Sequence, residues 1–155
     1  MSPSRPVLLL VAVAVSALTS CGGAIAPPSE MVGAWKGTAE VACSWCTTRE
    51  LAVTLTIGAD GTVTGRIGDA TLAGGRLARN TSPPAKRMGA PTRYVVRATM
   101  TGPIVASEGI SRESISIFVD VSGGALIGGF RTSGQESGDR ATALLAGSLR
   151  EVAKG

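Results

Sequence analysis

The sequence predicts an all-β domain, in which eight antiparallel strands form an up-and-down barrel. Three observations favour this fold class: apolar and polar residues alternate in successive short runs from residue 32 onward, glycine accounts for 21 of the 155 residues, and the polar residues are mainly Thr, Ser and Arg. Alternation with a period of two is typical of strands with one buried face. Abundant glycine favours turns and bulges over long helices. A β-sandwich with a similar number of strands is the alternative architecture.

The expected strands follow one another at residues 32–41, 51–57, 62–67, 70–78, 93–100, 115–120, 125–131 and 142–149. Leu51, Val53, Leu55 and Ile57 show the pattern most clearly, because a polar or small residue separates each from the next. Eight antiparallel strands in sequence can close on themselves, and closure removes both exposed edges of the sheet.

The connections between these strands carry turn signals. The Asp-Gly pair at 60–61 is typical of a hairpin, and the Gly-Gly pair at 74–75 predicts a bulge inside the fourth strand. Residues 80–92 form the one long loop, and residues 102–112 and 132–140 are further connections. Each connection is short enough to join neighbouring strands of a barrel.

The N-terminal part of the chain does not follow the strand pattern. Residues 7–18 form an apolar run of 12 behind a single basic residue, Arg5. A helix needs about 20 such residues to span a bilayer, so the run is typical of a secretory signal. We therefore expect a signal peptide at 1–20, a flexible Gly- and Pro-rich tether at 21–30 and one folded domain at 31–155.

A cysteine directly follows the apolar run. The sequence Leu-Thr-Ser-Cys at 18–21 resembles the lipobox of bacterial lipoproteins. The resemblance implies cleavage before Cys21 and attachment of a diacylglycerol, with fatty acids such as palmitate, to its sulfur. The domain would then be anchored in the cell envelope on the extracytoplasmic side of a membrane. Gly22, and not an acidic residue, directly follows Cys21, so the outer membrane is expected where the cell has one.

A short motif opens the first expected strand. Gly33-Ala34-Trp35 resembles the G-x-W signature of lipocalins and related calycin barrels. In that family the tryptophan closes the bottom of the barrel, and a basic residue near the end of the last strand packs over it. The resemblance assigns that second role to Arg150, through a cation–π contact. The alternative is a core tryptophan in an unrelated β fold.

Two cysteines remain once Cys21 is assigned to the lipid. Cys43 and Cys46 lie between the first two expected strands, and a four-residue turn brings its ends within about 7 Å, which a disulfide can span. Because extracytoplasmic compartments are oxidising, we expect these two cysteines to form a disulfide. A thioredoxin-like redox role would need a helix at this motif, and a metal site would need further ligands.

The composition excludes several classes of function. The chain has no histidine, which excludes Ser-His-Asp and Cys-His catalysis and His-ligated metal or haem. It also lacks closely paired carboxylates and a phosphate-binding loop, so we expect no enzymatic activity, no cofactor and no metal. The net charge is +4, or 14 − 11 = +3 without Arg5, and aromatic residues make up only 3%. These values do not favour a nucleic-acid partner.

One stretch of the chain is distinctly basic. No acidic residue lies between Asp69 and Glu108, and this segment contains six basic residues that form a candidate patch: Arg76, Arg79, Lys86, Arg87, Arg93 and Arg97. Such a patch could bind anionic lipid headgroups or an acidic partner. The alternative is that these are ordinary solvated charges on strand faces and a loop.

Two functions remain open for the anchored domain. Small residues on the expected inward faces, such as Gly37, Gly65 and Gly147, either leave room for a ligand or let the barrel flatten without a cavity. The first arrangement predicts a lipocalin-like protein that binds a small apolar or amphipathic ligand. The second predicts a protein-interaction module, such as an inhibitor of a secreted hydrolase or an envelope assembly factor, with a functional loop at 80–92 or 132–140.

Overall fold

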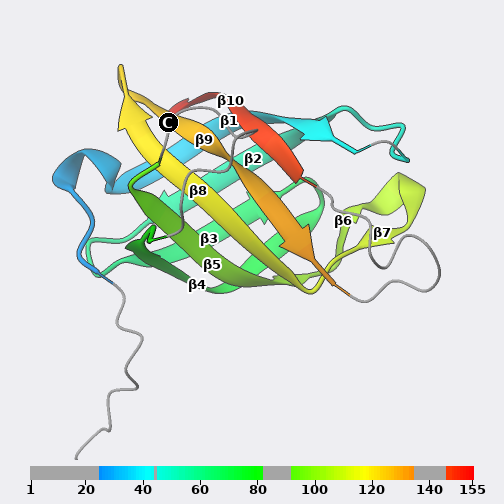
Figure 1. Ribbon diagram of the computed structural model, residues 1–155, viewed down its shortest axis with the longest axis horizontal. Coiled ribbons are helices and arrows are strands. Elements are labelled where there is room, and N and C mark those ends of the chain that lie inside the picture. Colours follow the sequence, from blue (N-terminus) through cyan, green and yellow to red (C-terminus); the bar gives the residue numbers. More distant parts are fainter. Residues whose placement is uncertain (1–24, 44, 82–91, 135–145) are drawn as a thin grey trace, which may run out of the picture.

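Eight strands close into one antiparallel barrel in the computed structural model (Figure 1). The structure describes residues 25–43, 45–81, 92–134 and 146–155. Each barrel strand pairs with its predecessor along the chain, and the last strand, β10, pairs with the first, β1. The predicted all-β barrel is therefore confirmed, and the alternative β-sandwich is not the architecture of this chain.

The barrel strands are β1 (Gly33–Ala42), β2 (Glu50–Ile57), β3 (Thr62–Ile67), β4 (Ala70–Arg79), β5 (Tyr94–Thr101), β8 (Ser114–Ser122), β9 (Ala125–Ser133) and β10 (Ala146–Lys154). Between β5 and β8 lies a small hairpin of β6 (Pro103–Val105) and β7 (Ile110–Ser111), joined by the 3-10 turn η2 (Ala106–Glu108). A second 3-10 turn, η1 (Ser29–Met31), precedes β1. This hairpin could not be predicted from the sequence, because its strands are too short to show alternation.

The last strand differs from its predicted position. It ends at Lys154 rather than at residue 149, and the predicted start at 142–145 lies outside the described residues. Glu151 has a positive φ of 51°, and the register with β9 shifts between Ser148 and Val152. This irregularity breaks the alternation, so the continuation of the strand to Val152, which is buried, could not be read from the pattern.

The predicted turn and bulge are present. In the β2–β3 turn the Gly61 N–H donates to the Gly58 carbonyl at 3.0 Å, and the Asp60 carboxylate accepts from the Thr62 N–H at 2.9 Å. In β4, Gly74 has a φ of +62° and the register with β5 shifts between Ala73 and Arg76. A positive φ is easily adopted by glycine, which explains why the bulge falls at this position.

The barrel interior is packed with apolar side chains. Along β2 the buried residues Leu51, Val53, Leu55 and Ile57 alternate with exposed ones, as predicted. The largest fully buried side chains of the described residues are Trp35, Phe130, Met31, Leu55, Ile57, Ile67, Leu77, Ile104, Ile110, Ile117 and Leu126. Each contributes about 1.5–3 kcal/mol through burial, so the core supplies the main stabilising term.

The two ends of the barrel have different structures. We call them the Trp35 end, where η1, the β2–β3 turn and the end of β10 lie, and the disulfide end, where the β1–β2 connection and the β6–β7 hairpin lie. Figure 1 shows η1 at one extremity and β6 and β7 at the other. The described part of the chain thus begins and ends at the Trp35 end.

Candidate functional site: two closed ends and a basic outer face

The Trp35 end is closed by the indole and its neighbours. Trp35 is 2% exposed, and its Nε1–H donates to the carbonyl of Met31 at 2.8 Å. The Met31 side chain is itself fully buried. Lys154, at the end of β10, places its Nζ 5.3 Å from the centre of the Trp35 ring. The segment before β1 and the last residue of β10 therefore seal this end together.

The basic residue over Trp35 is Lys154 and not Arg150, which corrects the assignment made by resemblance. Arg150 points outward and donates to the Glu40 carboxylate from Nε at 3.1 Å and from Nη2 at 2.7 Å. The register explains the difference, because Trp35 lies opposite Lys154 whereas Arg150 lies opposite Thr38. A cation near the end of the last strand does pack on the tryptophan, but it belongs to Lys154, the last residue of β10.

The disulfide end is organised by the predicted bridge between Cys43 and Cys46. Their Cα atoms are 5.5 Å apart, and both residues are buried. Arg49 donates from Nη1 to the Cys43 carbonyl at 2.7 Å. The bridge and this hydrogen bond tie the β1–β2 connection into a compact loop, which we call the disulfide loop (43–49).

Glu108 joins the disulfide loop to the β6–β7 hairpin. Its carboxylate accepts from the Thr47 N–H at 3.1 Å, the Thr47 hydroxyl at 2.6 Å and the Thr48 N–H at 2.5 Å, and also from the Thr48 hydroxyl. Four donors stabilise the charged form and lower the pKa of Glu108 to about 2, with the Thr47 and Thr48 side chains as the largest causes. This role of Glu108 could not be predicted, because no neighbouring residue in the sequence indicates a partner 60 residues away.

Further contacts hold the hairpin over the disulfide end. The Arg112 guanidinium lies 5.4 Å from the centre of the Trp45 ring, and Arg112 is 4% exposed. On the other side, the Asp69 carboxylate accepts from the Ala106 N–H at 2.9 Å. The hairpin is thus attached both to the disulfide loop and to the β3–β4 turn, and it covers this end of the barrel.

The space beside the small interior residues is filled by neighbouring strands. A Cβ on Gly147 would lie 2.6 Å from the Phe130 ring and 2.5 Å from the Glu40 carbonyl oxygen. A Cβ on Gly37 would meet the Glu151 backbone at 2.5 Å, and one on Gly65 the Thr54 backbone at 2.0 Å. These glycines therefore allow close packing of strands and of one aromatic ring, which answers the question that the sequence left open at these three positions.

The predicted basic patch divides into separate groups. Arg93 is engaged: it donates from Nε to Asp120 Oδ2 at 2.8 Å and from Nη2 to Oδ1 at 2.6 Å, and lies 3.8 Å from Glu30. These bonds lower the pKa of Asp120 and raise that of Arg93. Arg79 is exposed at the end of β4. Lys86 and Arg87 lie outside the described residues, as does Cys21.

Three other arginines are brought together on the outside of the barrel. Arg76 on β4 lies opposite Arg97 on β5, and both are exposed. Arg97 lies opposite Ser116 on β8, which in turn lies opposite Arg131 on β9. We call the outer surface around Arg76, Arg97 and Arg131 the basic face. Arg131 was not part of the predicted patch, because only the strand register places it there.

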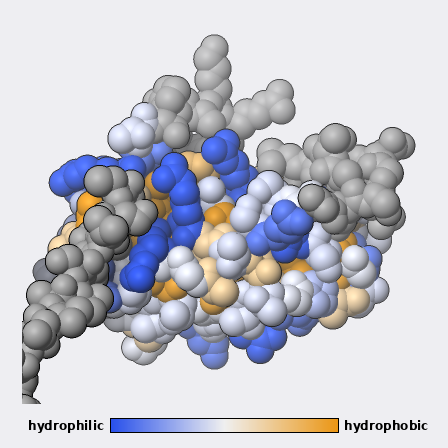
Figure 2. Space-filling view, turned by 90° about the horizontal axis from the view of Figure 1, so that it is seen from below, coloured by the Kyte–Doolittle hydropathy of each residue, from blue (hydrophilic) through white to orange (hydrophobic). Residues whose placement is uncertain are grey.

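The basic face forms no ion pair with a carboxylate of the described residues, although the charge of Arg76 helps to lower the pKa of Asp60 in the β2–β3 turn. No carboxylate oxygen in that part of the chain lies within 4.0 Å of a guanidinium nitrogen of Arg76, Arg97 or Arg131. The Arg131 guanidinium instead lies 5.2 Å from the centre of the Phe118 ring. Figure 2, seen from the side of β4 and β5, shows strongly hydrophilic side chains standing out between paler residues. The three guanidinium groups are thus not held in ion pairs by carboxylates of the described residues.

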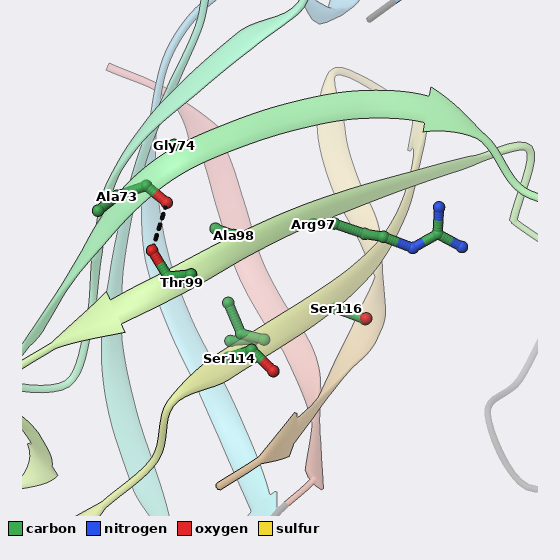
Figure 3. A pocket seen from close by; sticks show the side chains of 8 residues that line it. Ala73, Gly74, Arg97, Ala98, Thr99, Ser114 and Ser116 are labelled. Carbon is green, nitrogen blue, oxygen red and sulfur yellow. Dashed lines mark hydrogen bonds between the residues drawn. The ribbon is translucent and has the colours of Figure 1, made fainter. Parts of the chain in front are cut away.

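Two shallow hollows lie between these arginines. One, of about 360 Å³, is lined by Ala73, Gly74, Arg97, Ala98, Thr99, Ser114, Ile115 and Ser116. The other, of about 340 Å³, is lined by Ser114, Ser116, Arg131, Thr132 and Ser133. Figure 3 shows the Ser114 and Ser116 hydroxyls beside β5, where the Thr99 hydroxyl donates to the Ala73 carbonyl at 3.0 Å. Both hollows thus combine hydroxyl groups with one guanidinium.

Comparison of the chain with protein-family models, with curated proteins and with solved structures found no match. Within the described residues, no cluster of three or more His, Cys, Asp or Glu side chains is placed to hold a metal ion. No helix in that part of the chain has the length and apolar character needed to cross a membrane.

Proposed function

We propose that this chain is a membrane-anchored lipoprotein of the cell envelope, and that its barrel is a non-enzymatic module that binds an anionic partner through the basic face. The anchor is proposed from the Leu-Thr-Ser-Cys motif at 18–21. The binding role is carried by one observation, namely the row of Arg76, Arg97 and Arg131 across β4, β5, β8 and β9, with no carboxylate oxygen of the described residues within 4.0 Å of their guanidinium nitrogens.

Like charges directly opposite each other in a sheet are destabilising. Arg76 and Arg97 are such a pair. Neither forms a hydrogen-bonded ion pair like that of Arg93 with Asp120, and only a longer-range interaction with Asp60 acts on Arg76. An anionic partner would offset this repulsion, and guanidinium groups bind carboxylate or phosphate with two parallel hydrogen bonds. The arrangement is therefore understandable as a binding surface and unfavourable as a purely structural feature.

The barrel fold is compatible with a ligand in its interior, but the packing favours the outer surface. Phe130 occupies the space beside Gly147, and Trp35, Met31 and Lys154 seal one end. The β6–β7 hairpin covers the other end through Glu108. A small apolar ligand would have to displace these contacts, whereas the basic face is accessible as it stands.

The experiment compares two triple variants of the full chain with equal net charge. In the first, Arg76→Gln, Arg97→Gln and Arg131→Gln remove the basic face. In the second, the control, Lys36→Gln, Arg66→Gln and Arg150→Gln remove three exposed charges from the other half of the barrel. Binding to polyphosphate is measured by fluorescence anisotropy at low and at physiological salt.

We expect the wild type and the control to bind in a salt-dependent way and the first variant to lose most of the binding. Equal loss in both variants would show that only net charge matters and would overturn the assignment of the face. The anchor is tested separately, by the intact mass of membrane-extracted protein beside a Cys21→Ser variant. A mature mass that starts at Cys21 with added acyl chains supports it, and an unmodified cysteine overturns it.

A further inference from the structure

We infer that the anionic partner of the basic face is the surface of the membrane that holds the chain, so that the barrel lies with β4 and β5 against the lipid headgroups. This inference rests on the proposed anchor at Cys21. It adds to it an orientation and a ligand, namely negatively charged headgroups bound by Arg76, Arg97 and Arg131.

The described residues begin at Ile25, on the barrel. The Ile25 N–H donates to the carbonyl of Leu77 on β4 at 3.2 Å, and the Ile25 side chain packs against the core. Leu77 is the direct neighbour of Arg76 in the sequence. The chain therefore leaves the barrel beside the strand that carries the first arginine of the basic face.

The tether between the barrel and the proposed lipid on Cys21 is short. Ile25 is fixed on the barrel and Cys21 is four residues away. Four residues span at most about 14 Å when fully extended. The lipid on Cys21 would thus hold the headgroup layer within about 14 Å of Ile25, a distance comparable with the screening length of about 8 Å at physiological salt. The charges of β4 cannot be far from the membrane surface.

So short a tether can bring either of two surfaces to the membrane, the Trp35 end or the basic face. At the Trp35 end, the carboxylates of Glu30 and Asp120 lie around Arg93 and offset its charge, so Arg79 is the exposed arginine of that end outside an ion pair of the described residues. On the basic face three arginines lie together with no carboxylate of the described residues within 4.0 Å, and Asp60 acts on Arg76 only at longer range. A negatively charged surface attracts uncompensated arginines, each by about 1 kcal/mol, and therefore selects the basic face.

The basic face is polar, with hydroxyl groups beside its arginines. The Ser116 hydroxyl lines the hollow beside Arg97, next to Thr99 and Ser114, whose hydroxyls are hydrogen-bonded to Ala73 and Ser133. A hydroxyl and a guanidinium together can bind the phosphate of a headgroup. Ile127, at 38%, is the one large apolar side chain that is exposed among the described residues. Contact through headgroups fits this surface better than insertion into the hydrocarbon layer.

The test uses the lipidated full chain, inserted from outside into preformed vesicles. One set contains phosphatidylcholine alone, and the other contains phosphatidylcholine mixed with phosphatidylglycerol. Phenylglyoxal modifies accessible arginines, and mass spectrometry of peptides gives the rate at each position. Arg66 and Arg150, on β3 and β10, are internal controls on the other half of the barrel.

We expect anionic vesicles to slow modification of Arg76 and Arg97 by roughly fivefold relative to neutral vesicles, and to leave Arg66 and Arg150 unchanged. High salt should abolish the difference. Uniform slowing at all four arginines would indicate a general effect of the vesicle charge and would overturn the orientation.

The failures of the two proposals can be told apart. If the chain is lipidated but Arg76 and Arg97 react equally on both vesicles, membrane docking is wrong, while polyphosphate binding still tests the basic face and would then indicate an acidic protein as its partner. If the intact mass shows no lipid, the anchor is wrong, and the docking that depends on it falls with it.

Discussion

The ammonium group of Lys154 lies 5.3 Å from the centre of the Trp35 ring, and these two residues stand opposite each other in β10 and β1. The contact joins the first and last strands at the point where the barrel closes. Trp35 is anchored from the other side by the hydrogen bond from its Nε1–H to Met31. One aromatic ring thus connects the segment before β1, the first strand and the end of the chain.

We predict that Lys154→Met lowers the free energy of unfolding by about 0.5–1 kcal/mol, the usual value of a cation–π contact at an exposed site. Methionine keeps the apolar stem and removes only the charge. Urea unfolding of the single variants and of each combined with Trp35→Phe gives the coupling energy. Lys154 should couple to Trp35, and Arg150→Met should not. Coupling of Trp35 to Arg150 instead would contradict the assignment.

Of Trp35 and its basic partner, only Trp35 could be placed from the sequence. The position of Trp35 at the start of β1 was predictable, because alternation and the Gly-Ala-Trp motif mark the strand directly. The basic partner was not, because the alternation places the end of the last strand at residue 149, whereas β10 continues to Lys154. The register then puts Trp35 opposite Lys154 and Arg150 opposite Thr38.

We predict that Gly147→Ala destabilises the barrel by about 1–3 kcal/mol, the usual cost of overpacking a core. The added methyl group would lie 2.6 Å from the Phe130 ring and 2.5 Å from the Glu40 carbonyl oxygen. The measurement is the midpoint of urea unfolding, with Ser148→Ala at the neighbouring exposed position as the control. A neutral or stabilising effect at Gly147 would indicate free space beside it and would restore the interior as a ligand site.

The basic face was only partly visible in the sequence. Arg76 and Arg97 belonged to the predicted patch, since a long stretch without acidic residues is a local property of the chain. Arg93 proved to be neutralised by Asp120, and Arg131 joined the face. Both corrections involve residues far apart in the sequence, and only strand register determines which of them meet.

We predict that the contact of Glu108 between the β6–β7 hairpin and the disulfide loop is lost in acid. The pKa of Glu108 is lowered from 4.5 to about 2 by the four donors of Thr47 and Thr48. A lowered pKa in the folded state means that the carboxylate stabilises the fold above pH 4.5, and that this contribution is lost as the pH falls from about 4.5 towards about 2. Hydrogen-exchange protection of the Thr47 and Thr48 amides should fall over this range.

The control for this prediction is a pair of neutral substitutions in the same region. Glu108→Gln should lower protection of the Thr47 and Thr48 amides at neutral pH and remove its dependence on pH between about 4.5 and about 2. Glu113→Gln, which leaves these hydrogen bonds in place, should keep the wild-type profile. If Glu108→Gln titrated like the wild type, another group would have to hold the hairpin.

We predict that replacing both Cys43 and Cys46 by alanine lowers the free energy of unfolding by about 2 kcal/mol, the value expected for so short a closed loop. Reducing the wild-type protein should give the same loss, and a reductant should have no further effect on the variant. Urea unfolding measures both. Because Glu108 also holds the loop through Thr47 and Thr48, Glu108→Gln should increase the loss on reduction. Purely additive losses would show that the bridge and the carboxylate stabilise the disulfide end independently.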